Sequence, residues 1–153
     1  MQRLDAYAVD PKALHAILAM ERYVRDSDLD PRLYELVKIR ASQINGCAYC
    51  LDMHTRDARE LGEDQRRLDI LAAWREAPEF FTDAERAALA LTEAVTSIGK
   101  AGVPVAVWQE VTAAFDDATV VQLLMAIATI NVWNRFAVAT HQSLPDRPPS
   151  ARA

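Results

Sequence analysis

Apolar side chains recur every three to four residues along most of the chain, which is the pattern of amphipathic α-helices. Asp10-Pro11 and Asp30-Pro31 each place an N-capping side chain directly before a proline that suits the first helical position. These and other start and stop signals predict helices over about residues 11–25, 31–45, 47–61, 64–76, 83–98, 104–115 and 118–140. We therefore expect an all-α fold, a compact bundle of about six to eight helices.

The segment 118–140 predicts the longest helix, and it is apolar on nearly every side. Such a helix must be covered all round. A chain of 153 residues has limited material for this cover, so we expect a homo-oligomer in which subunit contacts supply the rest. We expect residues 1–144 to form a single helical domain and residues 145–153 to form a mobile, proline-rich tail.

The net charge of −5 and the pI near 5.2 argue against nucleic acid as a partner, and the arginines are interspersed with acidic residues. The N-terminus lacks the apolar core of a signal peptide, and polar residues interrupt the long apolar region. We therefore expect a cytoplasmic protein without a membrane partner. The sequence has no flavin or nicotinamide motif, so we expect no bound cofactor.

The most informative motif is Cys47-Ala48-Tyr49-Cys50, which contains both cysteines of the chain and is followed by His54. At about 100° per residue, the two thiols and the imidazole lie on one face of a helix. Two thiols at this spacing can close a disulfide or bind a metal, but zinc usually needs four ligands and this chain is short of them. We therefore predict a redox pair and no metal, in preference to two inert buried thiols.

Which cysteine is the more reactive stays open on the residues alone. A helix that begins near Cys47 favours a thiolate there, because unpaired backbone N–H groups and the positive end of the helix dipole face that sulfur. The neighbouring base His54 instead favours Cys50.

Residues 35–54, with Glu35 twelve positions before the cysteine pair and His54 four positions after it, resemble the core of the alkylhydroperoxidase AhpD-like proteins in the carboxymuconolactone decarboxylase superfamily. Residues 131–136 resemble a second segment of the peroxidase-related branch of that superfamily. Some AhpD-type enzymes have a histidine inside the cysteine pair, where this chain has Tyr49.

The resemblance implies an all-helical, homo-oligomeric fold and thiol-dependent reduction of hydroperoxides. It implies that Glu35 and His54 form a proton relay and that Cys47 and Cys50 form the redox pair. In this assignment Cys50, the cysteine nearer the histidine, attacks the peroxide, and Cys47 resolves the sulfenic acid as a disulfide. The implied reductant is an external dithiol, carried by a lipoylated or thioredoxin-like protein.

Two other functions remain open. The chain could be a redox sensor or disulfide-exchange protein that is not an enzyme, or it could be a lactone decarboxylase like the name-giving members of the superfamily. The intact cysteine pair counts against the lactone reaction, which does not depend on it. On a helical wheel alone, Glu35 points away from the apolar stripe of its helix and would be a solvated surface residue.

Three other polar residues fall in apolar helical surroundings: Arg40, Asn134 and Arg135. Buried or interface positions would require polar partners for them. We expect these residues to serve packing or assembly, although Asn134 or Arg135 could border a substrate pocket. His15 and His141 are poor candidates for metal ligands.

Overall fold

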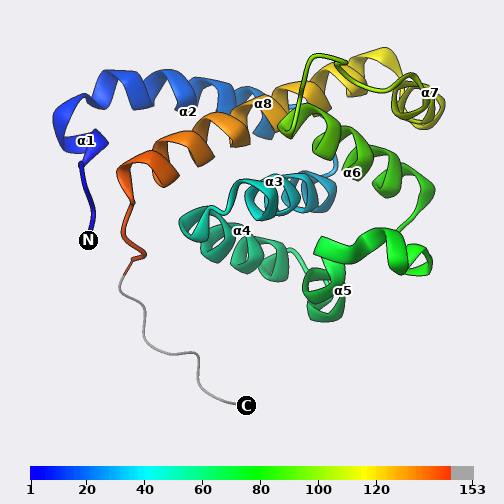
Figure 1. The fold of residues 1–153 in the computed structure, drawn as a ribbon, viewed down its shortest axis with the longest axis horizontal. Helices are drawn as coiled ribbons and strands as arrows, with labels where there is room; N and C mark the ends of the chain where they lie inside the picture. Colours follow the sequence, from blue (N-terminus) through cyan, green and yellow to red (C-terminus); the bar gives the residue numbers. More distant parts are fainter. Residues whose placement is uncertain (146–153) are drawn as a thin grey trace.

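The computed structural model describes residues 1–145, and every regular element in this range is a helix (Figure 1). The α-helices are α1 (Ala6–Val9), α2 (Pro11–Arg25), α3 (Pro31–Asn45), α4 (Ala48–Glu60), α5 (Gln65–Ile70), α6 (Asp83–Thr96), α7 (Val105–Ala114) and α8 (Asp117–Thr140). Two short 3₁₀ helices, η1 (Leu71–Glu76) and η2 (Pro78–Phe80), join α5 to α6. The all-α prediction is confirmed.

The two aspartate caps form as the sequence predicts. The Asp10 carboxylate accepts the backbone N–H groups of Lys12 and Ala13, and Asp30 accepts those of Arg32 and Leu33. Each cap satisfies donors that have no partner inside the helix, an effect that contributes about 1 kcal/mol. The starts of α2 and α3 are therefore fixed by local sequence.

Helix α3 lies at the centre of the bundle, where it packs against α4, α6 and α8. Helix α2 lies along α8 (Figure 1). The side chains of Leu36, Val37 and Ile39 are completely buried. Burial of each one contributes about 1.5 to 3 kcal/mol. This packing leaves α3 with almost no solvent-facing side, and that determines the environment of every polar residue on it.

The predicted helix 64–76 is wrong in its second half. Only Gln65–Ile70 is α-helical, and η1 follows with a non-helical backbone at Ala73. Leu71 and Trp74 are buried there, and the Trp74 indole N–H donates to Glu93 on α6 at 2.9 Å. Tertiary burial therefore overrides the local helical pattern. The short helix α1 was not predicted, because its four residues carry too little periodicity.

The single-domain boundary at residue 144 stays a prediction. The predicted mobile tail at 145–153 falls, from residue 146 onward, outside the described residues.

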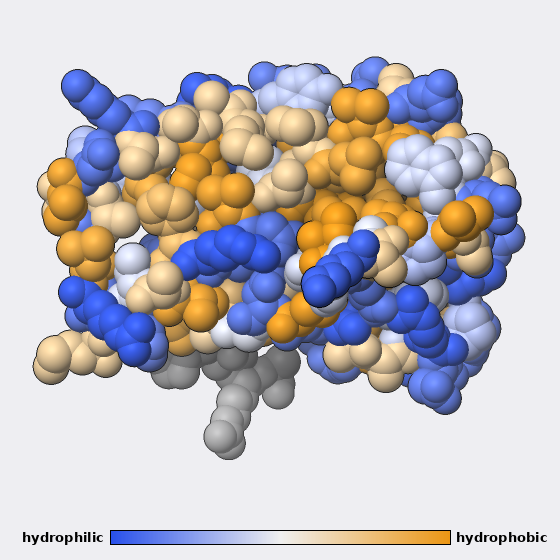
Figure 2. All heavy atoms as spheres, turned by 45° about the horizontal axis from the view of Figure 1, so that its top comes forward, coloured by the Kyte–Doolittle hydropathy of each residue, from blue (hydrophilic) through white to orange (hydrophobic). Residues whose placement is uncertain are grey.

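Helix α8 is long and apolar enough to cross a membrane by length and composition, and it is the one such helix among the described residues. In this fold it packs against α2, α3 and α6. Its solvent side still carries exposed apolar side chains, among them Val121, Phe136 and Val138. Figure 2 shows apolar side chains gathered over the face that α2 and α8 form.

We expect a homo-oligomer at micromolar protein concentration, because exposed apolar side chains on α8 gain cover from a second subunit. Size-exclusion chromatography with light scattering gives the mass directly. A mass of 17.1 kDa over the whole concentration range would refute this expectation.

Candidate active site

A left-handed turn brings the two cysteines to the start of α4. Helix α3 ends at Asn45, and Gly46 adopts φ 66°, a conformation that glycine takes without steric cost. The Cys47 backbone N–H then donates to the Ser42 carbonyl at 3.0 Å. This turn reverses the chain, so that α4 packs back along α3 and His54 of α4 reaches Glu35 of α3.

Cys47 is the N-cap residue of α4, and its Sγ accepts the backbone N–H of Cys50 at 3.3 Å. Both thiols are free and buried. A hydrogen bond from the Cys50 thiol, assisted by backbone N–H groups of the helix start, lowers the pKa of Cys47 to about 7 although burial opposes the shift. The same hydrogen bond and burial raise the pKa of Cys50. Of the two thiols, Cys47 is therefore the more readily ionised.

Asn134 on α8 closes the site behind the two sulfur atoms. Its side chain is completely buried and hydrogen-bonds both cysteines. The same amide donates to the Ser42 hydroxyl at 3.0 Å and accepts from Asn45 at 2.9 Å. The sequence indicated that Asn134 needs polar partners, and this expectation is confirmed. The partners link α3 and α8 directly beneath the cysteines.

The other two polar residues in apolar surroundings have structural partners away from the cysteines. Arg40 on α3 forms an ion pair with Glu93 on α6, with 2.8 Å between Nη2 and Oε1. Arg135 donates to the side chain of Asn131 at 2.8 Å. Neither arginine lines the cavity described below, so both serve packing, as the sequence indicated.

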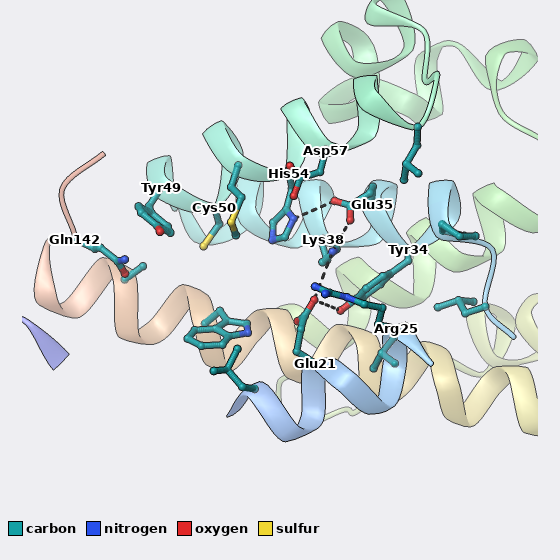
Figure 3. A pocket seen from close by; sticks show the side chains of 18 of the residues that line it. Glu21, Arg25, Tyr34, Glu35, Lys38, Tyr49, Cys50, His54, Asp57 and Gln142 are labelled. Atoms are coloured by element: carbon teal, nitrogen blue, oxygen red, sulfur yellow. Dashed lines mark hydrogen bonds and ion pairs between the residues drawn. The ribbon is translucent and has the colours of Figure 1, made fainter. Parts of the chain in front are cut away.

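The predicted relay residues meet. His54 Nδ1 lies 3.0 Å from Glu35 Oε2, and both side chains are buried. An ionised carboxylate only accepts hydrogen bonds. His54 Nδ1 therefore carries a hydrogen atom and donates a hydrogen bond to Glu35. The second ring nitrogen, Nε2, is then the proton-accepting atom of His54. Figure 3 shows Cys50, His54 and Glu35 side by side along one wall of the pocket.

The helical-wheel expectation that Glu35 is a solvated surface residue is wrong. Glu35 is only 6% exposed. The wheel considers one apolar stripe on α3, whereas α4, α6 and α8 all pack against this helix. A glutamate in such a position needs partners, because an unpaired buried carboxylate is costly.

Lys38 supplies one of these partners, and the sequence analysis did not identify it. Its side chain is 4% exposed, and its Nζ lies 2.5 Å from Glu35 Oε1 and 3.7 Å from Glu21 Oε1. The ammonium group also sits 3.8 Å from the centre of the Tyr34 ring, and the Tyr34 hydroxyl donates to Glu21 at 2.8 Å. Figure 3 shows this charged group at one end of the pocket. A lysine three residues after Glu35, within a run of buried apolar residues, was the available signal.

The electrostatics of Glu35 follow from these contacts. Burial alone would raise its pKa, but the hydrogen bond from His54 and the charge of Lys38 outweigh burial and lower the pKa below its ordinary value. Burial and the neighbouring Glu21 raise the pKa of Tyr34. At neutral pH, therefore, Glu35 is a carboxylate and Tyr34 is a neutral phenol.

We expect Lys38→Met to destabilise the protein by about 3 to 5 kcal/mol at neutral pH, because the substitution leaves the buried Glu35 carboxylate without its cation. The depressed pKa of Glu35 means that its contribution to stability is present above the unfolded value of about 4.3 and is lost as the pH falls through the folded value. Lys38→Met raises that pKa, so acid unfolding should begin at a higher pH. Thermal unfolding measured from about pH 7 to about pH 3 tests this expectation.

The double variant Lys38→Met/Glu35→Gln is the control for this prediction, since it removes both charges. It should recover part of the stability at neutral pH and show a weaker pH dependence. Equal losses in the single and double variants would contradict the assigned pairing.

A cavity of about 380 Å³ connects these groups. Cys50, His54, Glu35 and Lys38 all line it, whereas Cys47 does not. Its apolar walls come from α2, α3, α4, α8 and the α2–α3 loop, and they include Leu18, Val24, Leu29, Met53, Leu61 and Trp133. The cavity is large enough for a small organic molecule, and it brings that molecule to the Cys50 thiol and the His54 imidazole.

Glu35, His54 and Asp57 form the one group of described residues whose donor atoms come close enough together to hold a metal ion. Two cations already neutralise these carboxylates. Lys38 Nζ pairs with Glu35 at 2.5 Å, and Arg56 pairs with Asp57 at 2.7 Å. The local charge therefore disfavours a further cation. The two cysteines do not belong to this group.

Comparison with known proteins places this chain in a family. The sequence profile described as "Carboxymuconolactone decarboxylase family" matches residues 11–94. The uncharacterized protein YdfG of Bacillus subtilis (strain 168) is 41% identical over 138 residues, which cover 90% of this chain and 93% of YdfG. The chain belongs to the carboxymuconolactone decarboxylase family and is an AhpD-like member of it.

Solved structures agree with this assignment. A protein of unknown function from Agrobacterium tumefaciens, ATU0492, considered a candidate antioxidant defence protein AhpD, superposes with a TM-score of 0.92. It is 38% identical, and the match covers 96% of this chain and all of that one. The debrominase Bmp8 superposes with a TM-score of 0.78 over 89% of this chain and 73% of its own, at 18% identity. This second likeness concerns the fold alone.

Proposed function

We propose that the protein is a thiol-dependent peroxidase that reduces organic hydroperoxides through the Cys47/Cys50 pair. The observation that carries the proposal is the cavity of about 380 Å³ that presents Cys50, His54 and Glu35 together, with a second thiol one helical turn away. The apolar walls suit the organic part of a hydroperoxide. The resemblance to AhpD-type proteins supports the same reaction class.

In the proposed reaction, the Cys50 thiolate attacks one oxygen of the peroxide and the O–O bond breaks. The departing alkoxide takes the proton that His54 Nε2 accepted from the Cys50 thiol, and Glu35 orients the imidazole and stabilises its protonated form. Cys50 becomes a sulfenic acid. The Cys47 thiolate then attacks the Cys50 sulfur, hydroxide leaves as water after protonation, and a disulfide forms.

The lower pKa belongs to Cys47, whereas the proposed attack is by Cys50. A hydrogen bond from the Cys50 thiol lowers the pKa of Cys47, and the Cys50 thiol keeps its proton in the resting state. Transfer of that proton to His54 Nε2 produces the Cys50 thiolate at the cavity wall. We assign the attack to Cys50 because Cys50 lines the large cavity and Cys47 does not.

The catalytic cycle then needs an external dithiol, since the cysteine pair ends each turnover as a disulfide. We propose a donor of the lipoyl or thioredoxin class, acting on a cytoplasmic homo-oligomer that needs no bound cofactor. A redox sensor would use the same disulfide without turnover, and this is the main competing function.

The decisive experiment counts peroxide equivalents. The purified protein should consume many equivalents of cumene hydroperoxide when dithiothreitol is present, and its thiols should oxidise and recover without unfolding. The Cys47→Ser/Cys50→Ser double variant measures the uncatalysed background. Consumption of about one equivalent per protein molecule would favour the redox sensor instead.

A further inference from the structure

The two cysteines open into different cavities. Cys50 lines the large cavity of about 380 Å³, whereas Cys47 lines a second cavity of about 330 Å³. The second cavity lies between the start of α4, with Gly46 and Ala48, and the end of α8, with Val138 and His141. Tyr49, the residue between Cys47 and Cys50 on the same helix, contributes to both cavities and so stands at the partition between them.

This arrangement matters because thiol exchange has a strict geometry. A thiolate attacks a disulfide sulfur in line with the bond that breaks, from the side opposite the leaving sulfur. Cys47 lines the second cavity and not the large one, so a thiol that reaches Cys47 from a cavity arrives through the second cavity. Cys50 lines the large cavity, together with His54 and the proposed peroxide site.

We propose that the reducing thiol enters through the second cavity and attacks Cys47. This inference rests on the proposed function for the origin of the disulfide. The donor thiolate forms a bond to Cys47 Sγ, the Cys47–Cys50 bond breaks, and its electron pair leaves on Cys50 as a thiolate beside His54. The second thiol of the donor then attacks the donor sulfur of the mixed disulfide. Cys47 leaves as a thiolate, and the donor becomes a cyclic disulfide.

The environment of each sulfur fits its part in these two steps. Cys50 leaves toward the imidazole of His54, which can return its proton. Cys47 leaves as an anion that the Cys50 backbone N–H stabilises at the helix start, and a stabilised thiolate is the faster leaving group. Because Cys47 is 1% exposed, the donor must be a thiol on a slender aliphatic arm.

A trapping experiment on the unsubstituted protein tests the site of attack. The protein is oxidised with diamide, so that the disulfide forms independently of any peroxidase activity, and is then treated briefly with 2-mercaptoethanol and N-ethylmaleimide. Peptide fragmentation between the two cysteines locates each group. We expect mercaptoethanol on Cys47 and maleimide on Cys50. The opposite placement overturns the proposal.

A matched pair of variants tests the entrance. Val138 is 42% exposed and lines the second cavity but not the large one, while Val105 is exposed on α7 and lines neither. Val138→Trp should slow reduction of the diamide-oxidised protein by dihydrolipoamide at least tenfold, and Val105→Trp should change it less than twofold. Equal rates in the two variants overturn the proposal.

The outcomes separate this proposal from the proposed function. A protein that fails to reduce peroxide but carries mercaptoethanol on Cys47 retains the donor entrance and loses the peroxidase assignment. A working peroxidase that carries mercaptoethanol on Cys50 keeps the function and loses the second entrance.

Discussion

Cys50→Ser is expected to abolish both peroxide turnover and sulfenic acid formation, whereas Cys47→Ser should still form a sulfenic acid but fail to recycle through the internal disulfide. The reason is position. Cys50 lines the cavity that also holds His54 and Glu35, and Cys47 lies outside it. Trapping with a dimedone probe and mass measurement detects the sulfenic acid in each variant.

The two variants also separate the effects of location and acidity. The hydrogen bond from the Cys50 thiol, assisted by backbone N–H groups of the helix start, lowers the pKa of Cys47 to about 7, so a reaction governed by thiolate content alone would proceed at Cys47. Sulfenic acid in Cys50→Ser and none in Cys47→Ser would therefore transfer the attack to Cys47. Circular dichroism of both variants checks that the helices are intact.

The sequence allowed the all-α fold and the position of the two cysteines at the start of a helix to be predicted, because both depend on local spacing. The aspartate caps form within three residues of the side chain that makes them. Cys50 and His54 line the same cavity because a spacing of four residues completes about one turn of α4, and Cys47 caps the start of that helix. Both features can therefore be read from short stretches of consecutive residues.

The surroundings of Glu35 and His54 could not be predicted in the same way, because they depend on which helices meet. Glu21 on α2 reaches Lys38 and Tyr34 on α3 only after these two helices pack together. Asn134 on α8 meets Ser42 across 92 positions of sequence. The helical-wheel prediction that Glu35 is exposed was wrong for the same reason, because local periodicity shows the apolar face of one helix and not the helices that pack around it.

Trp74 illustrates how tertiary contacts also change an element. The pattern of residues 64–76 favoured one continuous helix, but burial of Leu71 and Trp74 and the bond from Trp74 to Glu93 accompany a tighter 3₁₀ segment. Glu93 accepts from Arg40 and Arg75 as well. Its partners come from two separate elements, α3 and η1, and no local pattern contains such a group.

His54→Gln and Glu35→Gln should each slow the first oxidation of the reduced protein by roughly a hundredfold or more, the usual contribution of a positioned acid or base. Glutamine at position 54 cannot pass a proton to the departing alkoxide. Glutamine at position 35 can still accept the hydrogen bond from Nδ1, but it removes the negative charge that stabilises a protonated imidazole. Stopped-flow measurement with cumene hydroperoxide in excess isolates this step from disulfide reduction.

Glu93→Gln is the matched control, because Glu93 is also a shielded carboxylate in an ion pair, but it lies outside the cavity. Burial alone would raise the pKa of Glu93, yet its hydrogen bonds lower it, as they do for Glu35. Loss of this carboxylate should reduce stability while the oxidation rate of the folded protein stays within twofold of the unsubstituted rate. If Glu35→Gln behaves like Glu93→Gln, Glu35 serves only to neutralise Lys38, and His54 transfers the proton without a carboxylate behind it.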